Sequence, residues 1–287
     1  MKKSNKEVLL FTLPCLIFIG LIFYAPFLSS LYYSLTKWNG IDADVVFIGL
    51  DNFKKIFTAD SDFWKSLFFT LKYSVLFIIL VNLVSLFLAT MLVKKMKLAN
   101  FLRSLFFVPY IMSLILVGFI WRFIFSQGFA TLFEKTNLGV FNLSWLGAPN
   151  LAFISIVLVS VWQGLGFYLV LYIAGLQTIP DEIIEAASID GASGVKRFIY
   201  VTLPMLKPTI YTCLFMSLIN SIKVFDVIMA LTNGGPGTST TSITLNIYKE
   251  AFLNNNFGLG SAKSLLLFVL VIVLTQVITR LFNRQEK

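Results

Sequence analysis

The sequence contains no histidine, which excludes histidine general bases and histidine metal sites. It has only two cysteines, Cys15 and Cys213, and both lie within apolar runs, where they indicate small buried side chains and no disulfide framework. We find no cluster of Cys, Asp and Glu with metal-ligand spacing and no paired carboxylates inside the apolar runs. The sequence therefore predicts no metal site and no catalytic residues, and it leaves an intramembrane enzyme few groups to work with.

A Walker A loop is also missing. The segment Gly-Leu-Gly-Ser-Ala-Lys-Ser at 258–264 is superficially similar, but Ala262 stands where the loop needs a glycine before its lysine. Without a nucleotide site, the chain cannot drive ATP-powered work alone. We therefore expect no cofactor in this chain, and any ATP and Mg would have to be bound elsewhere.

The sequence is rich in apolar residues, which make up 57% of its 287 positions and include 30 Phe. That is too apolar for a soluble domain of this length. The net charge of +9 does not indicate nucleic-acid binding, because Lys and Arg mostly flank the apolar runs.

The length of the apolar runs predicts the fold class. A helix crosses a bilayer with about 20 apolar residues. We predict an all-α integral membrane protein with one transmembrane domain over residues 1–287. Six transmembrane helices are expected at 8–33, 73–93, 105–125, 151–176, 210–231 and 264–281. The first run is too long for a signal-peptide core and has no small-x-small cleavage site after it, so we expect it to be retained.

The distribution of cations predicts the orientation. If the amino terminus is cytoplasmic, the segments on that side carry Lys2, Lys3, Lys6, Lys94, Lys95, Lys97, Arg103, Lys196, Arg197, Lys207, Arg280, Arg284 and Lys287. The opposite segments hold fewer cations and most of the acids. The positive-inside rule then places both termini and the loop 179–208 in the cytoplasm.

This cytoplasmic loop carries much of the polar chemistry of the chain. Pro180 suits the first position of a helix, and Gly191 can end that helix in a left-handed conformation. Ser193 can cap a second short helix, which Pro204 and Pro208 would end before the fifth span. The pattern predicts two short helices joined by a turn on the membrane surface.

The same loop resembles a known family. Glu185-Ala186-Ala187, Gly191 and Val201-Thr202-Leu203-Pro204 match the spacing of the Glu-Ala-Ala loop of ABC-importer permeases, with Val201 in place of isoleucine. In that family the loop is the coupling helix that docks into a cleft on the ATPase subunit. The resemblance implies that Glu185, Ala186, Ala187, Gly191, Leu203 and Pro204 couple to an ATPase. The alternative is an ordinary amphipathic loop.

Two further elements resemble the sugar-importer permeases of the maltose type. They are Gly49-Leu50-Asp51-Asn52-Phe53 and Leu231-Thr232-Asn233-Gly234-Gly235-Pro236, and Trp38-Asn39-Gly40 and the helix 103–125 agree with that group. The resemblance implies a permease subunit that translocates a sugar or oligosaccharide across a bacterial or archaeal inner membrane. It also implies a second permease in a heterodimer, two ATPase subunits, an extracytoplasmic binding protein and no nucleic acid.

Sparse polar and aromatic residues within the spans are candidates for a solute pathway. A charge near the bilayer centre costs about 2.5–3.5 kcal/mol on insertion scales, so such residues usually face a cavity or a partner. The candidates are Trp162, Gln163 and Phe167 in the fourth span and Asn220, Lys223 and Asp226 in the fifth. Two alternatives stay open: the aromatic residues are packing, and Lys223 and Asp226, three apart, form a self-satisfied pair on one helix face.

Other functions are also compatible with parts of the pattern. An ABC importer for a non-sugar solute such as glycerol phosphate shares the Glu-Ala-Ala loop. A secondary transporter would work without an ATPase, but it normally has an internal repeat, and none is visible in this sequence.

Overall fold

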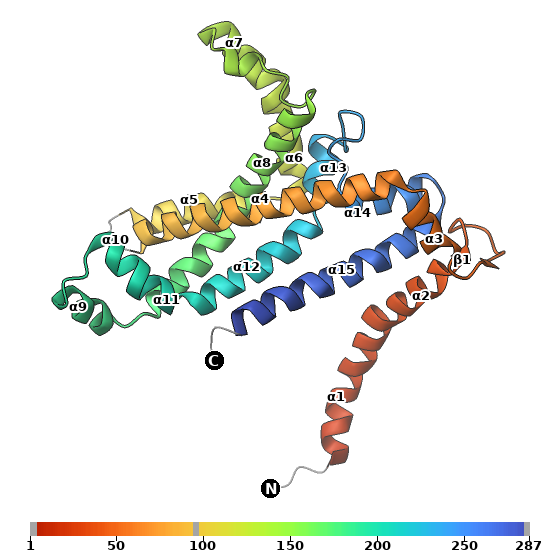
Figure 1. The fold of residues 1–287 in the computed structure, drawn as a ribbon, viewed down its shortest axis with the longest axis horizontal. Coiled ribbons are helices and arrows are strands. Elements are labelled where there is room, and N and C mark those ends of the chain that lie inside the picture. The colour runs from red at the N-terminus through yellow and green to blue at the C-terminus, as the bar shows by residue number, and fades with distance from the viewer. Residues whose placement is uncertain (1–4, 94–97, 284–287) are drawn as a thin grey trace. The chain divides into compact units, whose positions relative to one another are not determined.

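The computed structural model describes residues 5–93 and 98–283, and this part of the chain is mostly helical (Figure 1). Two compact units are present. The first comprises residues 5–64 and 246–270, and the second comprises 65–245, without the undescribed 94–97, and 271–283. We describe each unit by itself.

The first unit contains a long amino-terminal helix and a short hairpin. Its elements are α1 (Asn5–Ile19), the π-helical turn η1 (Gly20–Tyr24), α2 (Ala25–Ser34), β1 (Thr36–Lys37), β2 (Val46–Phe47), α3 (Asp51–Thr58), the start of α4 (Ser61–Leu92), the end of α14 (Ile243–Tyr248), the π-helical turn η5 (Lys249–Leu253) and the first half of α15 (Phe257–Asn283). The run α1–η1–α2 is continuous, as the first apolar run predicts.

The hairpin is held by backbone pairing and by one buried amide. β1 pairs antiparallel with β2 in the register Thr36 to Phe47. Asn52, which is 7% exposed, donates from Nδ2 to the carbonyls of Ser34 (2.9 Å) and Thr36 (2.8 Å). The Gly-Leu-Asp-Asn element therefore begins a helix and fastens the hairpin, and it is more than a surface turn.

A buried lysine joins three segments of the first unit. Lys263 of α15 is 1% exposed, and its Nζ lies 2.7 Å from Asp60 Oδ2 and 3.0 Å from Glu250 Oε2. The same Nζ donates to Asn246 Oδ1 at 3.0 Å. Residues 258–264 lie within α15, so the segment with a superficial likeness to a phosphate loop is helical. Its lysine binds carboxylates of this chain.

The second unit is a helical bundle. Its elements are the rest of α4, α5 (Ala99–Ile111), α6 (Leu114–Phe123), the π-helical turn η2 (Ile124–Gly128), α7 (Phe129–Thr136), the 3-10 turn η3 (Gly139–Asn142), α8 (Pro149–Gln177), α9 (Asp181–Ile189), α10 (Gly194–Arg197), the π-helical turn η4 (Phe198–Thr202), α11 (Leu203–Met205), α12 (Lys207–Ile222), α13 (Asp226–Leu231), the start of α14 and the end of α15. α8 lies at its centre, because α5, α6, α12 and α13 all pack against it.

Glycines let the central helix approach its neighbours. A Cβ at Gly166 of α8 would clash with the backbone of Phe106 and Phe107 in α5, and one at Gly175 would clash with Thr209 in α12. Small residues at helix contacts are the usual means of close packing in membranes, where helices gain no hydrophobic energy by leaving lipid.

Two of the six predicted spans are broken. The prediction of one kinked helix over 105–125 is wrong, because α5 ends at Ile111 and α6 begins at Leu114 after an extended Met112. The predicted span 210–231 is also interrupted, since α12 ends at Ile222 and α13 begins at Asp226. Five described helices are long and apolar enough to cross a membrane, or six if the bent pair Gly194–Met205 and Lys207–Ile222 is one span.

Part of the predicted orientation depends on residues that the structure does not describe. Lys2, Lys3, Lys94, Lys95, Lys97, Arg284 and Lys287 lie outside the described residues. The orientation therefore remains a prediction that labelling can test.

Single cysteines should report the side of each loop. In a variant without Cys15 and Cys213, we expect cysteines at Asp44, Leu138 and Gly237 to react with a membrane-impermeant thiol reagent in intact cells. A cysteine at Ser193 should react only after the cells are opened. Its reaction in opened cells also serves as the control that this cysteine is accessible to the reagent. Labelling of position 193 from outside would contradict the orientation.

Candidate functional site

A cavity of about 320 Å³ lies among the helices of the second unit. α4, α8 and the broken segment between α12 and α13 provide most of its walls. It is lined by Tyr73, Phe77, Tyr110, Leu114, Ser160, Gln163, Gly164, Tyr168, Asn220, Lys223, Val224, Phe225, Asp226 and Val227. Its volume is within the range of about 300–1,000 Å³ that is usual for small-molecule sites.

Two amides in the cavity retain hydrogen-bonding capacity. Gln163 is 8% exposed, and its Nε2 donates to the carbonyl of Tyr110 at 3.3 Å. Asn220 donates from Nδ2 to the hydroxyl of Tyr168 at 3.3 Å. Among the described residues, nothing donates to either amide oxygen. These oxygens can therefore accept hydrogen bonds from a polar solute. This agrees with the prediction that Gln163 and Asn220 line a solute pathway.

Lys223 and Asp226 also line the cavity, but they are not arranged as the helix spacing predicts. Lys223 directly follows the last residue of α12, and Asp226 begins α13 after the non-helical Phe225. Within the described parts of the chain, no ion pair joins the two side chains. The idea of a pair on one continuous helix face is therefore wrong, because residues 223–225 between α12 and α13 are not helical. Their charges face the cavity separately.

Two of the predicted pathway residues do not line the cavity. Trp162 packs edge-on against Trp121 at 5.5 Å between ring centroids. Phe167 stacks on Tyr110 at 5.0 Å and supports the wall from behind. The contacts of these two residues favour the packing alternative.

Sequence reasoning missed the aromatic side chains that α4 contributes to the wall. Tyr73 and Phe77 lie four residues apart on α4 and stack at 5.8 Å, and Tyr168 of α8 meets Phe77 edge-on at 6.4 Å. The i, i+4 spacing on α4 was visible in the sequence. However, it does not distinguish a cavity wall from ordinary packing between helices.

The Glu-Ala-Ala loop forms two short helices, as its sequence predicts. The sequence predicts Pro180 at the first position of this helix. In the structure α9 begins at Asp181, and Pro180 is the residue before it. Gly191 has φ of +82°, which confirms the left-handed position. The N–H of Ala192 donates to the carbonyl of Ala187 (2.9 Å) and that of Gly191 to the carbonyl of Ser188 (3.2 Å), which is a Schellman ending.

The first short helix, α9, buries one side chain and exposes most of the others. Ala187 is 8% exposed, so its side chain packs largely against this chain. Glu185 and Ala186 are exposed, and Ile189 is 87% exposed at the end of α9.

The second half of the loop differs from the expectation. Ser193 precedes α10 with extended backbone but makes no side-chain cap, and Pro204 lies inside the helical run α10–η4–α11 instead of ending it. The run ends at Leu206, where the chain bends by 72° into α12. Pro208 then lies in the first turn of α12.

The turn that follows α13 agrees with the sequence. Asn233 and Gly234 have φ of +51° and +85°, and Asn233 N–H donates to the carbonyl of Ile228 at 2.8 Å. The glycine-rich element therefore reverses the chain tightly after α13, and it keeps the broken helix pair α12–α13 beside the cavity.

Comparison with known proteins decides the class to which this arrangement belongs. Residues 82–287 match the family described as binding-protein-dependent transport system inner membrane component. The chain belongs to this family. The permease is thus a membrane component of a transport system, and its family is one of permeases and not of enzymes.

Named relatives cover almost the whole permease. The probable starch degradation products transport system permease protein AmyD of Thermoanaerobacterium thermosulfurigenes is 39% identical over 277 residues, which are 96% of this chain and 94% of the relative. The multiple sugar-binding transport system permease protein MsmF of Streptococcus mutans is 35% identical over 264 residues, with coverage of 92% and 91%.

A solved structure shares the fold of the permease. It is a bacterial alginate ABC transporter in complex with an alginate pentasaccharide-bound periplasmic protein. One of its chains superposes with a TM-score of 0.84 at 20% identity, covering 99% of this chain and 96% of that chain. The likeness establishes the ABC-permease fold.

Proposed function

We propose that this permease is the membrane-spanning subunit of an ATP-driven importer of sugars or oligosaccharides, which an extracytoplasmic binding protein delivers. The observation that carries the proposal is the cavity whose amide oxygens, tyrosines and separate charges face one space. Amides and hydroxyls suit the hydroxyl groups of a saccharide, and aromatic faces suit its C–H groups. The relatives named for starch degradation products and multiple sugars support the same class of solute.

The partners follow from this function. The permease would pair with a second permease subunit and two ATPase subunits, and the ATPases would bind ATP and Mg. α9, with Glu185, Ala186 and Ile189 exposed, is the proposed coupling helix, and Gly191 sets its angle. α12 and α13, after the bend at Leu206, would form the fifth of six spans, with the coupling loop 179–208 and both termini in the cytoplasm. ATP-driven closure of the ATPases would then move α9 and open the cavity alternately to each side.

Uptake by the assembled importer tests the proposal. The permease is co-expressed with its second permease, ATPase and binding protein, and uptake of radiolabelled maltose, maltotriose and sn-glycerol 3-phosphate is compared. We expect uptake of a saccharide that stops when the ATPase is inactivated. Uptake of glycerol phosphate alone would favour the non-sugar importer, and uptake without a working ATPase would favour a secondary transporter.

Changes in the two cavity amides should lower transport in a graded way. Loss of one hydrogen bond to a sugar hydroxyl costs about 0.5–1.5 kcal/mol. Gln163→Ala or Asn220→Ala should therefore raise the solute concentration needed for half-maximal uptake, or for half-maximal ATPase stimulation, about two- to tenfold. Assembly with the partners should be unchanged. Trp162→Phe, which alters a residue outside the cavity, is the matched control. Normal uptake by both amide variants over the full concentration range would remove the cavity from the pathway.

A further inference from the structure

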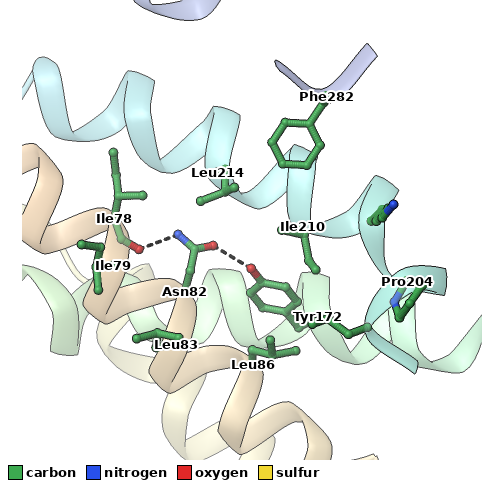
Figure 2. Close-up of a pocket in the computed structure, with 12 residues that line it drawn as sticks. Ile78, Ile79, Asn82, Leu83, Leu86, Tyr172, Pro204, Ile210, Leu214 and Phe282 are labelled. Carbon is green, nitrogen blue, oxygen red and sulfur yellow. Dashed lines mark hydrogen bonds between the residues drawn. The ribbon is translucent and has the colours of Figure 1, made fainter. Parts of the chain in front are cut away.

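A second cavity of the permease is an apolar groove of about 520 Å³. Leu83 of α4 lies on one wall, and Ile210 and Leu214 of α12 lie on another, while α15 adds Phe282 and α8 adds Tyr172 (Figure 2). Phe282 packs against Tyr211 of α12, with 5.1 Å between the centroids of the two rings. The groove lies entirely within the second unit and is separate from the solute cavity, with which it shares no lining residue.

The polar groups at the bottom of the groove already satisfy one another. Asn82, 8% exposed, donates from Nδ2 to the carbonyl of Ile78 (2.8 Å) and to Ser217 Oγ (3.0 Å). Its Oδ1 accepts from the hydroxyl of Tyr172 at 2.8 Å, as the dashed lines in Figure 2 show. Because both amide hydrogens are in use, the depth of the groove offers a ligand only apolar contacts.

One end of the groove differs, because a cation lies there. Lys207 is the first residue of α12, directly after the bend at Leu206, and its side chain is exposed. Among the described residues, it has no ion-pair or hydrogen-bond partner. Leu214 lies seven residues further along α12, about 10 Å deeper at 1.5 Å per residue. The groove is therefore cationic at the surface and apolar over the following two helical turns.

We propose that the groove binds an anionic phospholipid, with the phosphate on Lys207 and an acyl chain between α4, α12 and α15. Basic sites between transmembrane helices are known to bind lipid headgroups. An apolar helix of a second subunit would fill the groove equally well, but it would leave Lys207 without a counter-charge. The binding itself needs only that Lys207 lies at a membrane surface.

A lipid in this groove would also contact the end of the coupling loop. Leu203 and Pro204, at the end of that loop, line the groove together with Lys207. A lipid bound there contacts the segment that transmits movement of α9 to α12. This consequence depends on the proposed coupling role, whereas binding does not, so the experiment measures binding alone.

Native mass spectrometry of the purified permease, titrated with phosphatidylglycerol or phosphatidylcholine, tests the binding. We expect phosphatidylglycerol to bind more tightly and Lys207→Gln to weaken it about fivefold, since one cation near a membrane surface contributes roughly 1 kcal/mol. Lys207→Arg should retain it. Leu83→Trp, at a side chain that is 61% exposed, should fill the groove and reduce the binding of both lipids.

Arg280→Gln is the matched control. Arg280 is exposed near the end of α15, two residues before Phe282 and about 200° away around the helix, and it does not line the groove. Equal losses in Lys207→Gln and Arg280→Gln would show general surface attraction and overturn the proposal. Undiminished phosphatidylglycerol binding by Leu83→Trp, or cross-linking of a cysteine at Leu83 to another subunit, would also overturn it.

Discussion

Replacing Lys263 with methionine is expected to destabilise the permease by about 3–5 kcal/mol, which is the usual cost of removing one partner from a buried ion pair. The ammonium is buried against Asp60 and Glu250, at 2.7 and 3.0 Å. Without it, two carboxylates that are only 12% and 15% exposed face each other with no counter-charge. Thermal unfolding of the purified protein in detergent, together with its yield, measures the effect.

Neutralising the carboxylates at the same time should restore much of this stability. The triple variant Lys263→Met, Asp60→Asn, Glu250→Gln removes the uncompensated charges as well as the cation, so it should unfold at a higher temperature than Lys263→Met alone. Lys54→Met on the exposed face of α3 is the control for loss of a lysine. A Lys263→Met protein as stable as the control would show that the buried pair contributes nothing.

The second large effect is expected at the proposed coupling helix. Ile189→Asp places a charge on a side chain that is 87% exposed in this chain, so the fold should be preserved while docking fails. A central apolar contact is commonly worth about 2 kcal/mol, which corresponds to about 30-fold weaker binding of the ATPase. Co-purification of the ATPase and solute uptake should both fall.

Two further variants separate docking from folding. Gly191→Val forces a β-branched residue to φ of +82°, costs roughly 1–2 kcal/mol and should shift the angle of α9, with a similar loss of transport. Ala187→Asp, by contrast, should destabilise the loop itself, because Ala187 is buried within this chain. Ser193→Ala is the neutral control, since Ser193 makes no cap. Normal ATPase recovery and uptake in Ile189→Asp and Gly191→Val would make this an ordinary loop.

Patterns that depend on neighbouring residues were predictable. The left-handed Gly191 and the tight turn at Gly234 follow from glycine chemistry, and both appear in the structure. The run α1–η1–α2 follows from an apolar stretch long enough to cross a bilayer. Gln163 and Asn220 were predicted as pathway residues because amides are costly within lipid, and both line the solute cavity.

Other features arise only when distant segments meet. Hydropathy is the same whether a span is continuous or broken, so the hydropathy of the runs 105–125 and 210–231 did not indicate the breaks after Ile111 and Ile222. Trp162 and Gln163 are adjacent in the sequence, yet only Gln163 faces the cavity, because the packing of α8 decides which side is inward.

The sequence by itself determined that the chain is a helical membrane protein with a Glu-Ala-Ala loop, because the lengths of apolar runs and the spacing of glycines and prolines are local quantities. The tertiary structure alone decided the role of Lys263, whose carboxylate partners are 203 and 13 positions away (263 − 60 and 263 − 250). It also decided that Ala187 turns inward while Ile189 turns outward. The physical reason is that burial, unlike hydropathy, is a property of contacts between segments, and those contacts exist only once the helices have packed.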